Sequence, residues 1–371
     1  MYRLILKRTY FTGVFKKIEE DVIFKTQTEF MKDPSKTKVN LGIGIYADQK
    51  GNLPFLKDRY LPLSGDTAFL DSSEKFVFNT FVKNMFKFQT CGGTGALRLA
   101  SDIMNLKHNY TSAIPLPTWP NHTQIFKNNI LNSNELNLKG KKTDIIVIQT
   151  SCHNPTGIEY NYKQKKDILD YAEKHNITIL FDTAYLGLSG NFNAETEFLS
   201  MGLEKNINMF VALSYSKIAD AYGHRVGVLF FRPYNLSDTE LFNIKPNAEK
   251  IIRNNISNSP RYGSDMIMEN YLGSDEKIKE FKNKIKNMAD RINFTRLNLS
   301  LELQKNNINT NIGKGKGMFS LLPFSPEEIE SLKKNYHLYV LPNGRINICG
   351  ITEQNYEYVL NSIVENHKKF N

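Results

Sequence analysis

The sequence predicts an α/β protein with two parts: a large domain, in which helices cover a mainly parallel sheet, and a smaller α+β domain built from both chain ends. Short apolar runs alternate with helical patterns through the middle of the chain, which is typical of βαβ units. After Gly317 the pattern changes to short strands and helices. The chain has 371 residues, of which 40% are hydrophobic, and this is enough for a large core and a smaller one.

Four short runs in this alternation predict buried strands, because each is rich in β-branched or aromatic residues and is bounded by polar or turn residues. They cover residues 144–150, 177–182, 209–214 and 226–231. Helical periodicity lies before, between and after these runs. The predicted helices cover residues 14–32, 95–106, 163–174, 238–254 and about 264–303.

The end of the chain predicts the smaller domain, with a helix at 326–335, strands at 337–341 and 345–349, and a final helix. The first 45 residues have no strand partner of their own, so we expect them to join this domain. The predicted division is a candidate mitochondrial targeting segment at 1–10, an N-terminal arm and part of the small domain at 11–50, the large domain at 51–287 and the small domain at 288–371.

The charge pattern argues against nucleic-acid binding. The formal net charge is +10, from 48 Lys and Arg against 38 Asp and Glu, but outside the first 17 residues the basic side chains are spread out. A nucleic-acid-binding protein concentrates them in a patch or stripe. The three cysteines lie far apart in the sequence and no two have the spacing of metal ligands, which argues against a disulfide framework and favours a reducing compartment. No apolar run approaches the roughly 20 residues of a membrane span.

The opening segment is basic and contains no acidic residue up to Lys17. Mitochondrial transit peptides have this character, and the pattern before Tyr10 resembles a matrix-protease site with cleavage after that residue. The alternative is an ordinary first strand or a loose terminus. We therefore expect a mitochondrial matrix protein, with a cytoplasmic one as the alternative.

The polar and charged residues that could carry chemistry lie at the ends of the predicted strands. Asn154 follows the first strand, Asp182 and Tyr185 end the second, Ser214 and Lys217 end the third, and Arg225 precedes the fourth. Ligands of open α/β sheets bind at this edge. The segment 91–97 (CGGTGAL) opens a helix whose free N–H groups can bind a phosphate, although such glycine-rich segments are often only turns.

Each of these residues also has a structural explanation. Asp182 can cap a helix, and Lys217 is either a surface lysine or a desolvated nucleophile. His122 and His153 lie in turn motifs, and we expect them to form hydrogen bonds rather than to bind a metal. Taken together, however, the strand ends suit one cofactor: a phosphorylated pyridine aldehyde that is linked to a lysine and whose ring nitrogen pairs with a carboxylate.

With these motifs the chain resembles the aspartate aminotransferase family, the class I pyridoxal 5'-phosphate (PLP)-dependent aminotransferases of fold type I. The resemblance runs from about residue 15 to the end, and its motifs occur in family order. They are VNLGIGIY at 39–46, GGTGALR at 92–98, PTWPNH at 117–122, HNPTG at 153–157, FDTAY at 181–185, SYSK at 214–217 and GRIN at 344–347.

The resemblance implies a role for each matching residue. Lys217 would form the covalent link to PLP and then move the Cα proton, while Asp182 would hold the pyridine nitrogen. Asn154 and Tyr185 would bind the ring's phenolic oxygen, and Trp119 would stack on the ring. The phosphate would be bound by Gly93, Thr94, Ser214 and Arg225, with Tyr60 of a neighbouring subunit.

The resemblance also implies the substrates. Arg345 would bind the α-carboxylate, with Gly44, Trp119 and Asn154 in the same pocket, and Arg253 would reach the second carboxylate from the partner subunit of a homodimer. We therefore expect transamination between L-aspartate and 2-oxoglutarate, giving oxaloacetate and L-glutamate. The alternatives are an aromatic or kynurenine-type aminotransferase and a degenerate, non-catalytic dimeric homologue.

The chain departs from the family pattern outside these positions. Residues 218–220 read IAD where the family usually has NFG, His224 replaces a glutamate, and residues 258–260 read NSP in place of NPP. Ile256 stands where an aromatic residue is frequent, and the stretches 47–59 and 128–142 are shorter than usual. The expected catalytic residues Lys217, Asp182 and Tyr185 are all present.

Overall fold

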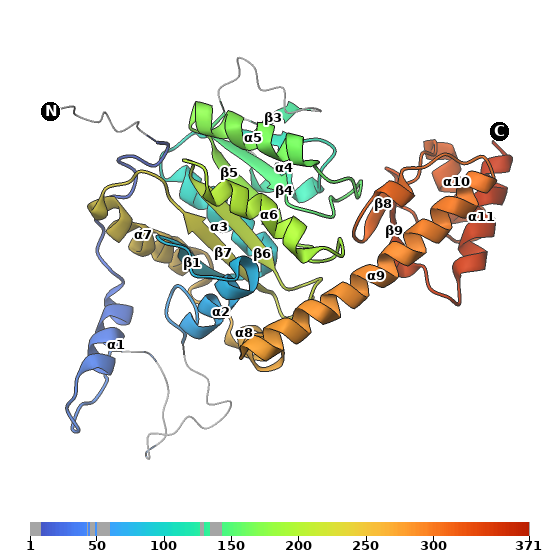
Figure 1. The fold of residues 1–371 in the computed structure, drawn as a ribbon. Helices are drawn as coiled ribbons and strands as arrows, with labels where there is room; N and C mark the ends of the chain where they lie inside the picture. The colour runs from blue at the N-terminus through green and yellow to red at the C-terminus, as the bar shows by residue number, and fades with distance from the viewer. Residues whose placement is uncertain are drawn as a thin grey trace.

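The computed structural model describes residues 9–42, 44, 49, 60–126, 130–133 and 143–370. A large domain surrounds a seven-stranded sheet, and the long helix α9 (Asp275–Lys305) connects it to a lobe formed by the C-terminal part of the chain (Figure 1). The shortened stretches at 47–59 and 128–142 lie almost wholly outside the described residues, as do residues 1–8 of the candidate targeting segment.

The sheet is mainly parallel, as predicted. Its strand order is β1-β7-β6-β5-β4-β2-β3, and only β7 runs antiparallel to its two neighbours. The strands are β1 (Phe86–Cys91), β2 (Ser112–Pro115), β3 (Ile130–Ser133), β4 (Ile145–Gln149), β5 (Thr178–Thr183), β6 (Met209–Ser214) and β7 (Val226–Arg232).

The four predicted strands correspond to β4, β5, β6 and β7, which form the buried centre of the sheet. The sequence did not predict β1, β2 and β3. The first of these contains Lys87 and Gln89, and the other two have only four residues each, so none of them forms a clear apolar run.

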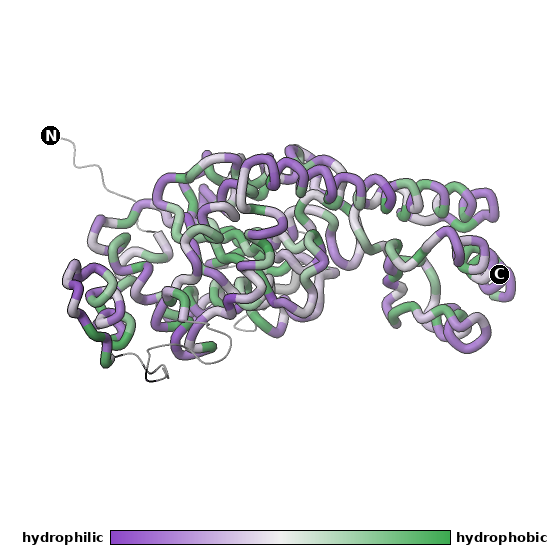
Figure 2. The backbone as a smooth tube through the Cα atoms, turned by 90° about the horizontal axis from the view of Figure 1, so that it is seen from below, coloured by the Kyte–Doolittle hydropathy of each residue, from purple (hydrophilic) through white to green (hydrophobic). Residues whose placement is uncertain are grey.

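Helices cover both faces of the sheet, because successive strand residues point to opposite sides. In β4, Ile146 and Ile148 belong to one buried cluster, whereas Ile145 and Val147 belong to the other. Apolar residues are accordingly concentrated around the sheet in the middle of the large domain (Figure 2). The helices of this domain are α2 (Thr67–Phe78), α3 (Gly92–Asn105), α4 (Pro120–Ile125), α5 (Tyr162–His175), α6 (Phe192–Leu203) and α7 (Asp238–Ile256).

The long helix predicted at 264–303 is interrupted. The chain forms α8 (Arg261–Ile267), a π-helical turn (Met268–Leu272) and then α9. The break lies at Gly273 and Ser274, where the Ser274 side chain accepts a hydrogen bond from the Lys277 N–H and so caps α9. The hydrophobic period continues across this point, which is why the sequence pattern alone did not reveal the break.

The C-terminal lobe has a two-stranded antiparallel sheet of β8 (Phe319–Leu321) and β9 (Arg345–Asn347), flanked by α10 (Pro326–Tyr336) and α11 (Tyr356–Lys368). The strand predicted at 337–341 is wrong, because His337 takes a left-handed conformation that ends α10 and the next residue bonds back to Leu332. The partner of β9 is instead β8, directly after Gly317.

The N-terminal segment lies elsewhere than we expected. Phe11 and Phe15 are buried against the large domain, and helix α1 (Val22–Lys32), which has no buried residue, lies at the opposite end of the molecule from the C-terminal lobe (Figure 1). The aromatic contacts of Phe11 with Phe210 and Phe231 explain this position. In the single chain, the described part of 11–50 therefore does not join the small lobe.

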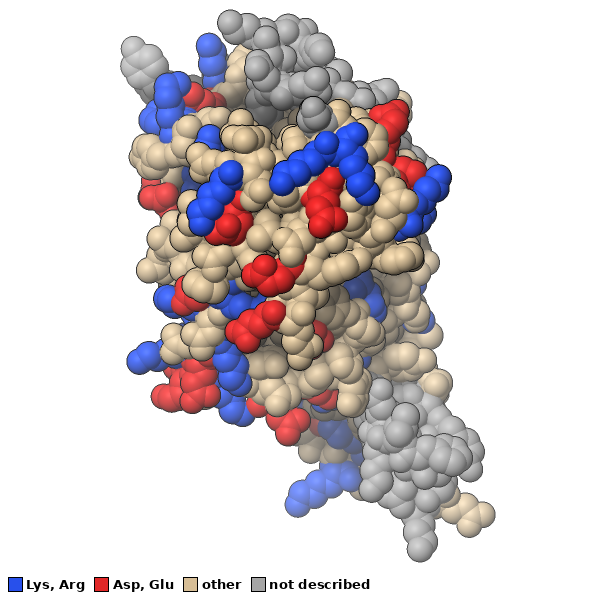
Figure 3. All heavy atoms as spheres, turned by 90° about the vertical axis from the view of Figure 1, so that its right-hand side faces the viewer, with Lys and Arg blue, Asp and Glu red and all other residues tan. Residues whose placement is uncertain are grey.

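One face of the molecule agrees with the charge pattern of the sequence. Figure 3 shows basic and acidic side chains interspersed over the face that it presents, without a continuous basic field. Among the described residues, no helix is both long enough and apolar enough to cross a membrane.

Candidate active site

The carboxyl ends of the parallel strands β4, β5 and β6 meet the start of α3 at one pocket, which is open to solvent. Such an edge is the usual ligand site of an open α/β sheet. Most of the residues predicted for the site line this pocket: Gly93, Thr94, Trp119, Asn154, Asp182, Tyr185, Ser214, Lys217 and Arg225.

One end of the pocket is suited to an anion. The N-terminus of α3 presents its free N–H groups there, and the Arg225 guanidinium lies beside it. Glycine permits this approach: a Cβ atom at Gly92, whose φ is +69°, would lie 2.6 Å from Nη2 of Arg225. A Cβ atom at Gly93 would lie 2.9 Å from Cβ of Ser214. Without side chains at Gly92 and Gly93, the start of α3 can lie this close to Arg225 and Ser214, which supports the predicted phosphate site.

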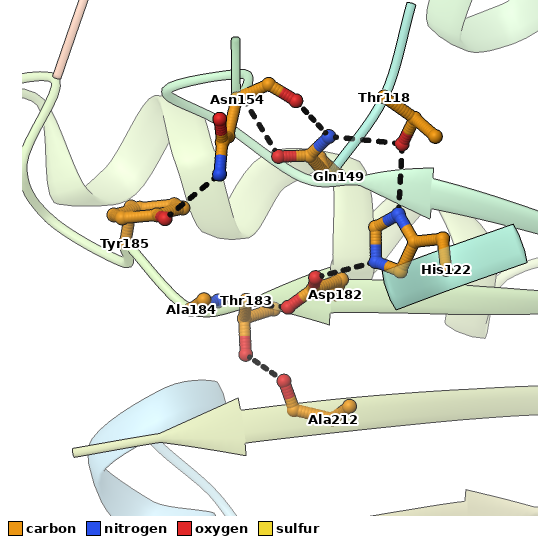
Figure 4. Close-up of polar contacts among 9 residues, drawn as sticks. All are labelled: Thr118, His122, Gln149, Asn154, Asp182, Thr183, Ala184, Tyr185 and Ala212. Carbon is orange, nitrogen blue, oxygen red and sulfur yellow. Dashed lines mark hydrogen bonds and ion pairs between the residues drawn. The ribbon is translucent and has the colours of Figure 1, made fainter. Parts of the chain in front are cut away.

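The Asp182 carboxylate also lines the pocket and is 6% exposed. Its Oδ2 is 2.9 Å from Nε2 of His122, whose Nδ1 is 2.8 Å from Oγ1 of Thr118 (Figure 4). Asp182 is part of β5, and the next helix begins only at Phe192, so it is not a helix cap. Among the described residues, no arginine or lysine bonds this carboxylate, which leaves it able to pair with a protonated ring nitrogen.

Gln149 and His122 complete this network, and sequence reasoning missed their roles. The Gln149 side chain accepts a hydrogen bond from the Asn154 N–H (2.8 Å) and donates one to the Asn154 carbonyl (2.9 Å). His122 does form hydrogen bonds, as expected, but its partner Asp182 is far away in the sequence. The only available signal for Gln149 was its position at the end of a buried strand.

Asn154 joins the pocket to the C-terminal lobe. Its Oδ1 accepts a hydrogen bond of 2.9 Å from Nη1 of Arg345, and its Nδ2 lies 3.5 Å from the Tyr185 hydroxyl. Burial is the main cause that raises the pKa of Tyr185, and the negative charge of Asp182 adds to it. The tyrosine therefore stays protonated and can donate a hydrogen bond to a ligand oxygen.

Lys217 follows β6 and faces the same space. Its Nζ lies 5.5 Å from the centre of the Tyr185 ring. Burial lowers the pKa of Lys217, Asp182 opposes this effect, and the positive charge of Arg225 adds to it. This supports the desolvated nucleophile over the surface lysine. The unusual residues that follow are packed, since Ile218 and Ala219 are both buried.

Four predicted residues do not line the pocket of the single chain. Arg345 contacts it through Asn154, whereas the other three lie away from it. Gly44 is exposed, and a Cβ atom there would have no neighbour within 4 Å, so the expected contact with the substrate pocket is not formed. The reason is the position of the N-terminal segment beside α7. Tyr60 is 54% exposed, and Arg253 binds Asp21 (Nε–Oδ2 3.2 Å) in a groove between α1 and α7. The predicted roles of Tyr60 and Arg253 require a second subunit.

A desolvated lysine, a buried carboxylate and an anion-binding helix start lie together at the strand ends of this α/β fold. Together they define an enzyme whose cofactor is linked to a lysine. The comparisons agree, because the family model for class I and II aminotransferases matches residues 36–363. The chain belongs to this family of PLP-dependent enzymes. Among the described residues there is no cluster of His, Cys, Asp and Glu that could hold a metal ion.

Individual relatives cover almost the whole chain. The mitochondrial aspartate aminotransferase of Dictyostelium discoideum is 29% identical over 388 residues, which is 93% of this chain and 90% of the relative. The structure of the cytoplasmic aspartate aminotransferase of Saccharomyces cerevisiae is similar with a TM-score of 0.77 and 28% identity, over 96% of this chain and 98% of that one. An aromatic-amino-acid aminotransferase from Burkholderia pseudomallei, covalently bound to PLP, has a TM-score of 0.77 and 26% identity, over 97% and 100%.

Proposed function

We propose that this aminotransferase transfers the amino group of L-aspartate to 2-oxoglutarate, giving oxaloacetate and L-glutamate. The observation that carries the transamination is the 2.9 Å contact between Arg345 and Asn154, because it brings a cation suited to the α-carboxylate of an amino acid to the mouth of the pocket that contains Lys217. The full-length similarity to enzymes named aspartate aminotransferase supports the same substrate.

The residues of the pocket fit PLP. The N-terminus of α3, Ser214 and Arg225 would hold its phosphate, Asp182 its ring nitrogen, and Trp119 would lie against the ring. When bound, PLP supplies a ring that accepts the electrons left at the substrate's Cα. The Asp182 carboxylate favours a protonated ring nitrogen, and His122 keeps that carboxylate oriented.

Lys217 would act as the base that removes the Cα proton and returns it elsewhere on the substrate–cofactor pair. A lysine can accept a proton only in its neutral form. Because burial lowers its pKa, a larger fraction of Lys217 is neutral at a given pH than for an exposed lysine. Arg345 would hold the α-carboxylate and so orient the substrate with its Cα proton toward the Lys217 amine.

An aromatic or kynurenine-type substrate is the second candidate, since similar solved structures include an aromatic-amino-acid aminotransferase. Purified PLP-loaded protein should have a higher kcat/KM for aspartate than for phenylalanine with 2-oxoglutarate as acceptor, because a dicarboxylate can bind two arginines. Steady-state assays of both amino acids measure this ratio. A preference for phenylalanine would replace aspartate as the proposed substrate and leave the transaminase class intact.

The proposed active unit is a homodimer. Arg253 and Tyr60 lie outside the pocket of their own chain. Several apolar side chains of the N-terminal segment and of α7 are exposed, among them Val39 (75%), Leu41 (92%) and Phe242 (75%), and Phe242 lines the same groove as Arg253. Large exposed apolar groups of this kind favour an interface. A second copy would supply an arginine and a tyrosine to each site.

For the compartment we propose the mitochondrial matrix, on the basis of the basic, acid-free start. A fluorescent reporter fused to residues 1–17 should be imported into mitochondria, and a diffuse cytosolic signal would contradict the proposal. Tyr10 argues against cleavage directly after it: the side chain is 6% exposed, and its hydroxyl donates a 2.8 Å hydrogen bond to the Met104 carbonyl. We therefore place any cleavage before this residue.

A further inference from the structure

The guanidinium of Arg345 rests on an aromatic ring that neither the motifs nor the proposed mechanism uses. Its Cζ lies 4.3 Å from the centre of the Phe319 ring. The same ring meets Tyr185 edge-on, with the ring centres 5.9 Å apart and the planes at 90°. Phe319 thus contacts the residue proposed for the α-carboxylate and a residue proposed for the cofactor.

The backbone of Phe319 is held by a second arginine, from α9. Arg296 is 1% exposed and donates hydrogen bonds to the carbonyls of Ile312 (2.9 Å), Gly317 (3.0 Å), Lys316 (3.2 Å) and Phe319. These partners are all backbone groups, and burial lowers the pKa of Arg296 to about 10. A buried charge without a carboxylate partner is costly, so a structural purpose is expected for it.

The turn that carries Asn154 closes on the same guanidinium. Gly157 has a φ of +72°, and a Cβ atom there would lie 2.9 Å from Nη2 of Arg296 and 2.6 Å from the Phe319 carbonyl. The N–H of Lys316 donates a 2.7 Å hydrogen bond to the Gly157 carbonyl. Arg296 therefore fixes α9, the start of β8 and the turn after β4 relative to one another.

We propose that Phe319 and Arg296 are positioning residues for the substrate's α-carboxylate: Phe319 supports the face of the Arg345 guanidinium, and Arg296 keeps the Phe319 ring in place. The edge of that guanidinium donates to Asn154, so its orientation is set from two sides. This inference rests on the proposed role of Arg345.

The first test is Phe319→Leu, which removes the aromatic face and keeps an apolar side chain. A cation over an aromatic ring contributes a factor of about 2 to 30 to an equilibrium constant, depending on its desolvation. We expect the Kd of succinate for the PLP-loaded protein, measured by calorimetry, to rise by about this factor. The KM of aspartate should rise similarly with little change in kcat, because the contact exists in both ground and transition states. Phe319→Tyr, which keeps the ring, should bind succinate as the wild type does.

The second test asks whether Arg296 acts through Phe319. Arg296→Lys should also weaken succinate binding, and the double variant should be scarcely weaker than the worse single variant, since both changes release the same contact. Arg291→Lys is the matched control: Arg291 also donates from α9 to backbone carbonyls, those of Cys349 and Ile351, which do not hold Phe319. It should leave the Kd unchanged, even if the melting temperature falls.

Arg345→Lys separates the inference from the function on which it rests. If Arg345→Lys weakens succinate binding and Phe319→Leu does not, the support by Phe319 is refuted and the carboxylate site stands. If Arg345→Lys has no effect, the proposed carboxylate site itself is wrong. If Phe319→Leu and Arg296→Lys each raise the Kd of succinate and their factors multiply in the double variant, Arg296 does not act through the Phe319 ring.

Discussion

Replacement of Lys217 by alanine is expected to reduce transamination by several orders of magnitude. A positioned acid–base group contributes about 10²- to 10⁴-fold to a rate, and the loss of the covalent link to the cofactor adds to this. The protein should still bind PLP, because the contacts of Asp182, Ser214, Arg225 and the α3 N-terminus do not involve the lysine. Single-turnover assays with aspartate, together with the PLP content of the protein, measure both parts.

Lys282→Ala is a matched control for this experiment. Lys282 is also partly buried, its pKa is lowered to about 8 by burial, and its ammonium lies 4.3 Å from the centre of the Phe192 ring, away from the pocket. Its loss should leave the turnover of the folded protein unchanged. A Lys217→Ala protein that transaminates at the wild-type rate would show that the lysine is not the catalytic base.

Replacement of Arg253 by leucine is expected to have the second largest effect, and a selective one. Leaving a desolvated carboxylate without its partner costs about 2–5 kcal/mol, which corresponds to roughly a 30- to 5,000-fold loss in kcat/KM. Aspartate and 2-oxoglutarate should suffer this loss, whereas phenylalanine lacks the second carboxylate. Arg261→Leu, which removes an exposed arginine paired with Asp265 on α8, is the control. Equal losses for aspartate and phenylalanine would contradict the dicarboxylate role.

Mixing two inactive proteins tests whether Arg253 acts in the partner's site. A hybrid of Lys217→Ala and Arg253→Leu subunits contains one site with an intact Lys217 and an intact Arg253 from the other chain. Activity should therefore return on mixing and reassociation. In the single chain Arg253 is bound by Asp21 and by the ring of Phe24, whose centre is 5.3 Å away, so binding of a substrate carboxylate requires it to exchange partners. Absence of any recovery would contradict a shared site.

The core of the site could be predicted from the sequence because its residues follow strands that are easily identified. Asn154, Asp182 and Lys217 come at or after the ends of β4, β5 and β6, and parallel strands bring their carboxyl ends to one edge. The supporting residues could not be predicted. His122, Gln149 and Arg296 act through hydrogen bonds to partners that are set by tertiary packing, and a periodic sequence pattern does not show which group a buried polar side chain will bond.

The errors at the level of the fold have the same origin. The start of α9 after Ser274 and the left-handed His337 depend on local caps within patterns that continue across them. The resemblance implied that Gly44 lines the substrate pocket, but in the single chain Phe11 and Phe15 attach the N-terminal segment to the large domain and Gly44 is exposed. Apolar residues in the sequence indicate that a segment packs, but not which surface it packs on.

The absorbance of the purified protein tests the central claim most directly. PLP linked to a lysine absorbs near the edge of the visible range, whereas its amine form is colourless. Wild-type protein should lose this absorbance when aspartate is added and regain it with 2-oxoglutarate, because the amino group passes from one to the other through the site of Lys217. Lys217→Ala protein should fail to complete this cycle. A wild-type spectrum that aspartate and 2-oxoglutarate leave unchanged would contradict the proposed transamination.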